Sequence, residues 1–200
     1  MLSAVGRAPV TSDIGLDKTN IKTDRGFIAV DPFMQTTEPG VYAIGDVIPT
    51  AQLAHVASTE GILAVEHMAG KKVHPINYDH VPSCTYTHPE VASVGLTEKK
   101  AIERGYDVKI GKFPFSALGK ANIIDEGHGM VKVVAEKKYD EVLGIHIVGP
   151  HATDLIAEGV AALELETTTE FLGHVMHPHP TMSEGILEAV HAALGHAIHI

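Results

Sequence analysis

The residues best suited to chemistry lie near the carboxyl end of the chain, in the segment HPHPTMSEG (residues 177–185). Pro178 and Pro180 fix their own φ angles and disfavour helical backbone at the residue before each of them, so His179 sits in a stiff, extended loop. Glu184 follows five residues later, in the first turn of a predicted helix. Its carboxylate can accept a hydrogen bond from one imidazole nitrogen and leave the other free as a base for a hydroxyl or a thiol.

A second interpretation of Glu184 is purely structural. Thr181 and Glu184 match a capping box, in which the glutamate carboxylate satisfies a backbone donor at the start of a helix. On spacing alone this interpretation is the stronger one. The two roles can coexist because a carboxylate has two oxygens.

Two further candidates lie in the first third of the chain. Asp46, in AIGDV, stands at the carboxyl end of an apolar strand at residues 41–46, and ligands of open α/β sheets bind at the carboxyl ends of strands. Its carboxylate could hold a sugar hydroxyl or could cap a turn. Leu53, Ala54 and His55 begin a helix predicted over residues 52–69, where backbone N–H groups favour negative charge, although every helix start shares this property.

Composition excludes several other functions. The net charge is −10, with 15 Lys and Arg against 25 Asp and Glu, so a nucleic acid partner is not expected. No apolar run approaches the ~18 residues of a membrane helix and no secretory signal is present, which predicts an intracellular protein that does not enter a membrane. Cys84 is the single cysteine, so no disulfide can form within the chain, and we interpret it as a structural thiol. The 14 histidines show no zinc-type spacing, and no metal site is expected.

The first 79 residues show a pattern of strands, loops and one helix. An apolar run at 2–5 predicts a strand, GFIAVDPFMQT predicts extended backbone from residue 26, and the strand at 41–46 precedes the helix at 52–69. Gly70 is a suitable helix stop. A linker-like stretch, KKVHPINYDHVPS, follows, and we place a domain boundary between residues 79 and 80.

The remaining residues, 80–200, group their strands before most of their helices. Strands are predicted at 84–87, 91–96, 108–115, 129–135 and 141–148, and helices at 98–104, 152–165, 168–174 and 182–194. Residues 136–140 read as a hairpin connection between the last two strands. This order predicts an α+β domain with an antiparallel sheet and flanking helices.

Several segments together resemble the carboxyl-terminal part of the dihydrolipoamide dehydrogenase family, within the flavin disulfide-reductase superfamily. These are GRAP, TTEPGVYAIGDV, LAHVASTEGILAVEHMAG, PSCTYTHPEVASVGLTE, GMVKVVAE, EVLGIHIVGPHATDLI, HPHPTMSE and GHAIHI, in this order. The resemblance implies that residues 1–79 contain the end of an NAD domain and the last segment of an incomplete α/β FAD-binding domain. Residues 80–200 would then be the interface domain that forms a homodimer.

The resemblance also implies roles for single residues. Asp46 would hydrogen-bond the sugar-alcohol chain of FAD, Gly45 would allow a close backbone approach, and Leu53, Ala54 and His55 would line the isoalloxazine. His179 would take a thiol proton from dihydrolipoamide, with Glu184 orienting its ring, at the flavin site of the other subunit. The implied partner is the lipoyl-bearing acyltransferase of a 2-oxo acid dehydrogenase complex, in the cytoplasm or, in a eukaryote, the mitochondrial matrix.

Other parts of that family pattern are missing from this chain. It has no Gly-x-Gly-x-x-Gly loop at a strand–helix turn and no Cys-x4-Cys pair. We therefore expect the isolated chain to be inactive and Met1 to be either an internal start or the point at which a longer chain was truncated. The alternatives are a free-standing, non-catalytic dimerisation module and a related flavin-dependent disulfide reductase; a mercuric reductase is disfavoured because no cysteine follows Cys84.

Overall fold

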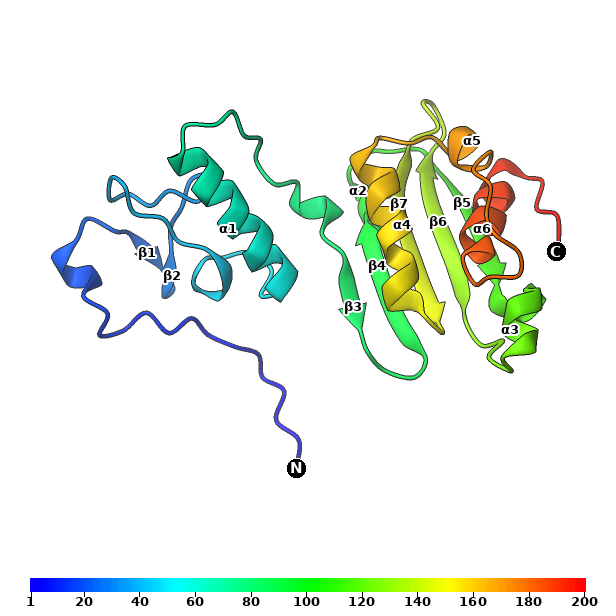
Figure 1. The fold of residues 1–200 in the computed structure, drawn as a ribbon, viewed down its shortest axis with the longest axis horizontal. Coiled ribbons are helices and arrows are strands. Elements are labelled where there is room, and N and C mark those ends of the chain that lie inside the picture. The colour runs from blue at the N-terminus through cyan, green and yellow to red at the C-terminus, as the bar shows by residue number, and fades with distance from the viewer. The chain divides into compact units, whose positions relative to one another are not determined.

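The computed structural model describes residues 1–200, which divide into a first unit of residues 1–77 and a second of 78–200. The second unit is built on one antiparallel sheet with the strand order β3-β4-β7-β6-β5 (Figure 1). Its strands are β3 (Ser83–Thr85), β4 (Glu90–Gly95), β5 (Val108–Pro114), β6 (Met130–Glu136) and β7 (Val142–Gly149). The strands β6 and β7 form the hairpin expected from residues 136–140.

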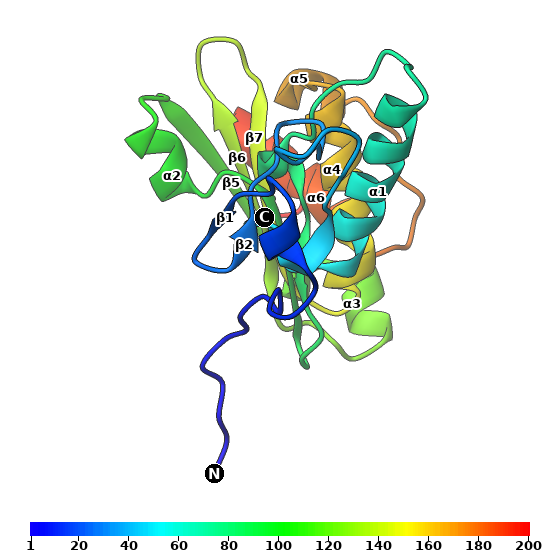
Figure 2. The ribbon, with the colours of Figure 1, turned by 90° about the vertical axis from the view of Figure 1, so that its left-hand side faces the viewer.

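Helices cover both faces of this sheet. α4 (Ala152–Glu164) packs on β4 and β7, and α6 (Glu184–Leu194) packs on β5 and β6, while the short α5 (Thr169–Leu172) packs on α6. α2 (Glu98–Glu103) lies on the opposite face (Figure 2). A further short helix, α3 (Gly119–Ile123), was not predicted. The expected α+β architecture, with an antiparallel sheet and flanking helices, is confirmed.

Strand alternation explains how the sheet acquires two cores. Val131, Val133, Ile145 and Ile147 are fully buried in the main core under α4 and α6. Val134 lies on β6 as well, but its side chain belongs to a smaller core under α2. Successive side chains of a strand point to opposite faces, so β6 contributes to both cores.

The first unit contains one long helix and little sheet. α1 (Ala54–Met68) forms where a helix was predicted, and a minimal hairpin joins β1 (Thr23–Asp24) to β2 (Phe27–Ile28). Short 3-10 turns occur at Leu16–Lys18 and Gly45–Val47. No helix in the chain is long and apolar enough to cross a membrane.

Two strands expected in this unit do not form. Residues 1–10 have no regular structure and leave Leu2 and Val5 exposed, and the segment at 41–46 makes only an isolated bridge between Tyr42 and Gln35. A strand is stabilised by hydrogen bonds to neighbouring strands, and neither segment has a paired strand within this chain. Apolar composition alone was therefore not enough to predict sheet.

Candidate functional site

The structure brings His179 and Glu184 together at the start of α6. His179 lies between the two prolines, with its side chain 75% exposed, and its Nδ1 is 2.9 Å from Oε1 of Glu184. Its other nitrogen, Nε2, makes no hydrogen bond within the chain. An exposed imidazole with one nitrogen held by a carboxylate and the other available can take up a proton from a bound substrate.

The second oxygen of Glu184 performs the structural role that its sequence position suggested. Oε2 accepts a hydrogen bond from the backbone N–H of Thr181 at 2.8 Å, and the Thr181 hydroxyl donates to the carbonyl of Pro178. The other half of a capping box is absent, because the residue before the helix is Ser183 and it makes no side-chain cap. Burial opposes ionisation of Glu184, but the hydrogen bonds from Thr181 and His179 outweigh it and lower its pKa.

His177 anchors the same loop from beneath. Its side chain is 4% exposed, with Nε2 2.7 Å from Oε1 of Glu158 on α4 and Nδ1 3.0 Å from the carbonyl of Val175. Two acceptors require both ring nitrogens to carry hydrogen, and the bond to Glu158 raises the pKa of His177. His177 is therefore a structural histidine, and its partner Glu158 was not predicted from the sequence.

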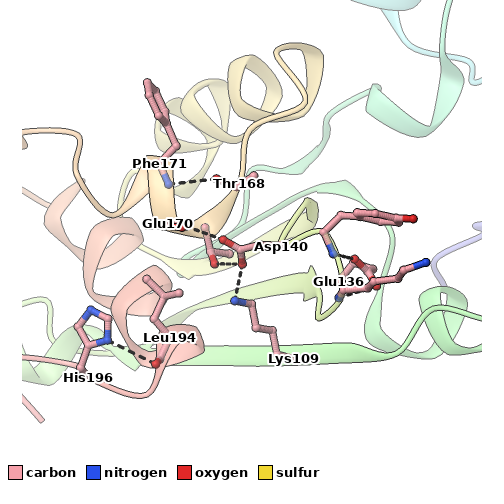
Figure 3. Close-up of polar contacts among 11 residues, drawn as sticks. Lys109, Glu136, Asp140, Thr168, Glu170, Phe171, Leu194 and His196 are labelled. Carbon is pink, nitrogen blue, oxygen red and sulfur yellow. Dashed lines mark hydrogen bonds and ion pairs between the residues drawn. The ribbon is translucent and has the colours of Figure 1, made fainter.

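A charged network fixes the segment that leads into this loop (Figure 3). Asp140, in the β6–β7 hairpin, pairs with Lys109 of β5 and accepts hydrogen bonds from the Thr169 hydroxyl and from the Glu170 N–H at 2.8 Å. Burial opposes its ionisation, but these donors outweigh it and lower the pKa of Asp140. Asp140 thereby ties α5 to the sheet, and Figure 3 shows the ring of Phe171 on α5 directed away from this network.

A second pair of glutamate and histidine side chains holds the carboxyl-terminal tail. Glu188 lies one turn beyond Glu184 on α6, and it is 3% exposed. It accepts from Nδ1 of His199 at 2.9 Å and from the backbone N–H groups of Ile198 and His199. The tail is thus fixed to the helix that carries Glu184, an arrangement that the sequence analysis missed.

The candidate residues of the first unit lie around one turn. Asp46, in the 3-10 turn Gly45–Val47, has a side chain that is 54% exposed and 3.8 Å from the Arg7 guanidinium. Arg7 also donates to the carbonyl of Gln52, just before Leu53, the residue that caps α1. Leu53 makes no side-chain cap, so the donors of the first helical turn, at 54–56, receive no side chain from it.

Cys84 lies half-buried in β3, where burial raises the pKa of its thiol. A raised pKa leaves the thiol protonated and unreactive at neutral pH. No group of three or more His, Cys, Asp or Glu side chains is placed to hold a metal ion.

Comparison with known proteins gives the family. The model of the pyridine nucleotide-disulphide oxidoreductase dimerisation domain matches residues 81–190, and the pyridine nucleotide-disulphide oxidoreductase model matches residues 1–61. This chain belongs to the pyridine nucleotide-disulphide oxidoreductases. Its second unit carries the match to the dimerisation domain of that family.

Similar members of the family are dihydrolipoyl dehydrogenases. The chain is 53% identical to the one from Bacillus subtilis, over all of this chain and 42% of the relative. It is 48% identical to the mitochondrial one from Pisum sativum, over all of this chain and 40% of that relative. The solved structure of LpdA from Mycobacterium tuberculosis is similar with a TM-score of 0.87 and 30% identity, over 92% of this chain and 40% of that one. The chain thus spans less than half the length of these oxidoreductases.

Proposed function

We propose that this chain supplies the acid–base pair and the dimer interface of a dihydrolipoyl dehydrogenase, which oxidises dihydrolipoamide to lipoamide with NAD+. The observation that carries the proposal is the His179 Nδ1 to Glu184 Oε1 contact of 2.9 Å on an exposed loop. The names of the relatives that are about half identical to this chain support the choice of substrate.

The protonation of His179 follows from the acceptor beside it. Because Glu184 can only accept, a neutral His179 carries its proton on Nδ1 and presents a lone pair on Nε2. A thiol of dihydrolipoamide loses its proton to Nε2, and the resulting thiolate is the nucleophile that a disulfide requires. The Glu184 carboxylate stabilises the positive charge that forms on the ring. With one cysteine, this chain does not supply the disulfide, so we assign it to residues outside these 200.

The turn at Gly45 and Asp46 fits a flavin cofactor. Gly45 has a φ of +69°, and a Cβ there would come within 3.1 Å of the Ala57 side chain, so both the backbone conformation and the close contact favour glycine at this position. The half-exposed Asp46 carboxylate can accept from a sugar hydroxyl, and the start of α1 at 53–55 favours negative charge. When bound, FAD would relay electrons from the disulfide to NAD+.

The homodimer that we propose is formed through the second unit. Apolar side chains stand exposed around a groove of about 390 Å³ beside the His177–Pro178 segment, among them Leu165, Phe171 and Met176, which are 78%, 70% and 94% exposed. Exposed apolar groups that line one groove favour a protein partner. The match to a dimerisation domain supports a second copy of the chain as that partner.

We also propose a domain organisation and a partner, both implied by the resemblance to dihydrolipoamide dehydrogenases. Residues 1–79 would be the end of an NAD domain and the last segment of an FAD-binding domain, and residues 80–200 the interface domain. The partner that presents the substrate would be a lipoyl-bearing acyltransferase of a 2-oxo acid dehydrogenase complex.

A second candidate is a non-catalytic dimerisation module. The observation in its favour is the single cysteine, since these 200 residues hold the interface but no redox pair.

A graft tests the proposal against this second candidate. The chain replaces the segment that it matches in the Bacillus subtilis relative, and NAD+ reduction by dihydrolipoamide is followed by the absorbance of the NADH that forms. We expect the graft to turn over and the 200-residue chain alone to be inactive. A graft that folds and retains FAD but shows no turnover would favour the non-catalytic module.

A further inference from the structure

Glu60 places a buried carboxylate under the loop that joins Gly45 to α1. It lies in the second turn of α1 and is fully buried. Its Oε2 accepts the backbone N–H of Gly45 at 2.7 Å, and its Oε1 accepts the Thr50 hydroxyl at 2.8 Å. A buried carboxylate is tolerated only where hydrogen bonds replace water, so these contacts are specific rather than incidental.

The face of α1 around Glu60 is shaped to receive the turn. Ala57, Glu60 and Gly61 lie on one helical face, because residues three and four apart are neighbours on a helix. A Cβ at Gly45 would approach the Ala57 Cβ to 3.1 Å, and a Cβ at Gly61 would approach Cδ1 of Ile44 to 3.2 Å. The turn is therefore in close contact with the helix on both sides of the carboxylate.

The two hydrogen bonds close the loop at both of its ends. The loop begins with the 3-10 turn Gly45–Val47, buries Ile48 completely and reaches Thr50, whose N–H donates to the Ile48 carbonyl. Asp46 lies inside the segment that Glu60 spans, with its own carboxylate half-exposed. Glu60 thus holds the backbone of this loop from within while Asp46 stays accessible.

We propose that Glu60 is a positioning residue for the flavin site, which fixes the loop at 45–50 so that Asp46 presents its carboxylate to the cofactor. The inference rests on the proposed function, because only a bound flavin gives Asp46 its role. Glu60 itself is too deeply buried to touch the cofactor.

The test variants at Glu60 differ in whether they can still bind the Gly45 N–H and the Thr50 hydroxyl. In Glu60→Gln the amide oxygen can accept from Gly45 and the NH2 can donate to the Thr50 hydroxyl, so both links survive. Glu60→Leu fills the same space without an acceptor and leaves the Gly45 N–H unsatisfied. Glu136→Leu is the matched control, since Glu136 is a buried carboxylate of the second unit that accepts the N–H groups of Lys138 and Tyr139.

Two measurements test separately whether Glu60 holds the loop at 45–50 and whether this loop position matters for flavin binding. Amide exchange at Gly45, measured by NMR on the 200-residue chain, should accelerate on the order of 10- to 100-fold in Glu60→Leu and return to the native rate in Glu60→Gln. In the grafted enzyme, FAD release should be faster in Glu60→Leu than in Glu136→Leu and native in Glu60→Gln. A general loss of stability would instead speed FAD release to the same extent in both leucine variants.

Unchanged Gly45 exchange in Glu60→Leu would overturn the inference. Faster exchange with FAD release equal to the Glu136→Leu control would also overturn it. That result would mean that Glu60 does hold the loop but that Asp46 has no role in flavin binding. If Glu60→Leu does not fold, Thr50→Val removes only the Oε1 link and should still raise Gly45 exchange and FAD release, by smaller factors.

Discussion

Replacing Glu184 with Gln separates the two contacts that its carboxylate makes. A glutamine oxygen can keep the hydrogen bond from the Thr181 N–H, and the amide NH2 then faces Nδ1 of His179. The NH2 donates to Nδ1, which moves the ring proton to Nε2. The reverse orientation is disfavoured because it sets the NH2 against the Thr181 N–H. A neutral imidazole with its proton on Nε2 cannot accept a thiol proton at that nitrogen, and the glutamine NH2 occupies Nδ1, so turnover should fall by about 10²- to 10⁴-fold.

The structure predicts a different effect on stability. Glu184→Gln keeps the contact with Thr181, so its free energy of unfolding should change by less than about 0.5 kcal/mol. Glu184→Ala loses that contact, at about 1 kcal/mol for a helix-terminal hydrogen bond, and also the pair with the exposed His179, at up to about 1 kcal/mol. The alanine variant should therefore lose about 1–2 kcal/mol.

Both quantities are measurable on the same proteins. Turnover is measured as dihydrolipoamide-dependent NAD+ reduction in the grafted enzyme, with flavin content checked by absorbance, and stability by urea unfolding of the 200-residue chain. A glutamine variant with native turnover would refute the orienting role of Glu184. A glutamine variant as unstable as the alanine variant would refute the inference that one oxygen of Glu184 serves His179 while the other stabilises the fold through Thr181.

Three further predictions concern the elements around the site. Asp140→Asn keeps a residue that tolerates the φ of +64° but removes the charge that faces Lys109. The free energy of unfolding, measured in urea, should fall by about 1–3 kcal/mol, and an unchanged value would contradict a stabilising role for the Asp140 contacts. Because the pKa of His177 is raised in the fold, its pair with Glu158 stabilises fully below about pH 6.5 and weakens as pH rises through the folded pKa. His177→Gln should therefore destabilise more at pH 6 than at pH 9 in urea titrations, and equal losses would oppose this assignment. Phe171→Asp should shift the chain toward monomer in light scattering, whereas Ile123→Asp, an exposed control on α3, should not; equal behaviour would argue against the groove as interface.

Periodicity and turn residues predicted the second unit well. The apolar patterns of β4 to β7, α4 and α6 recur at strand or helix spacing, and Gly195 ends the last helix where expected. α3 was missed because its five residues are too few to establish a helical period and its N-cap residue, Leu118, carries no capping side chain, whereas Thr97 and Thr168 cap the short helices α2 and α5. The local signals were sufficient for the longer elements whose partners lie within this chain.

The site was predicted only in its local part. His179 and Glu184 are five residues apart, so spacing alone brought them within reach, and the carboxylate of Glu184 contacts both the imidazole and a backbone N–H. Its role in orienting a catalytic base stays a prediction. Glu158 lies 19 residues from His177, and their pairing depends on how α4 packs. Glu60 lies 15 residues from Gly45, and no pattern identifies it as the acceptor beneath that turn. Contacts that depend on tertiary packing required the structure.

The central claim is that Nε2 of His179 is the base for the thiol of dihydrolipoamide, and one variant tests it directly. In the grafted enzyme, His179→Gln should retain FAD and the native fold but lose about 10²- to 10⁴-fold in turnover with dihydrolipoamide. Reduction of a non-thiol electron acceptor by NADH, which needs no thiol proton transfer, should remain near the native rate. A His179→Gln enzyme that oxidises dihydrolipoamide at the native rate would contradict the account.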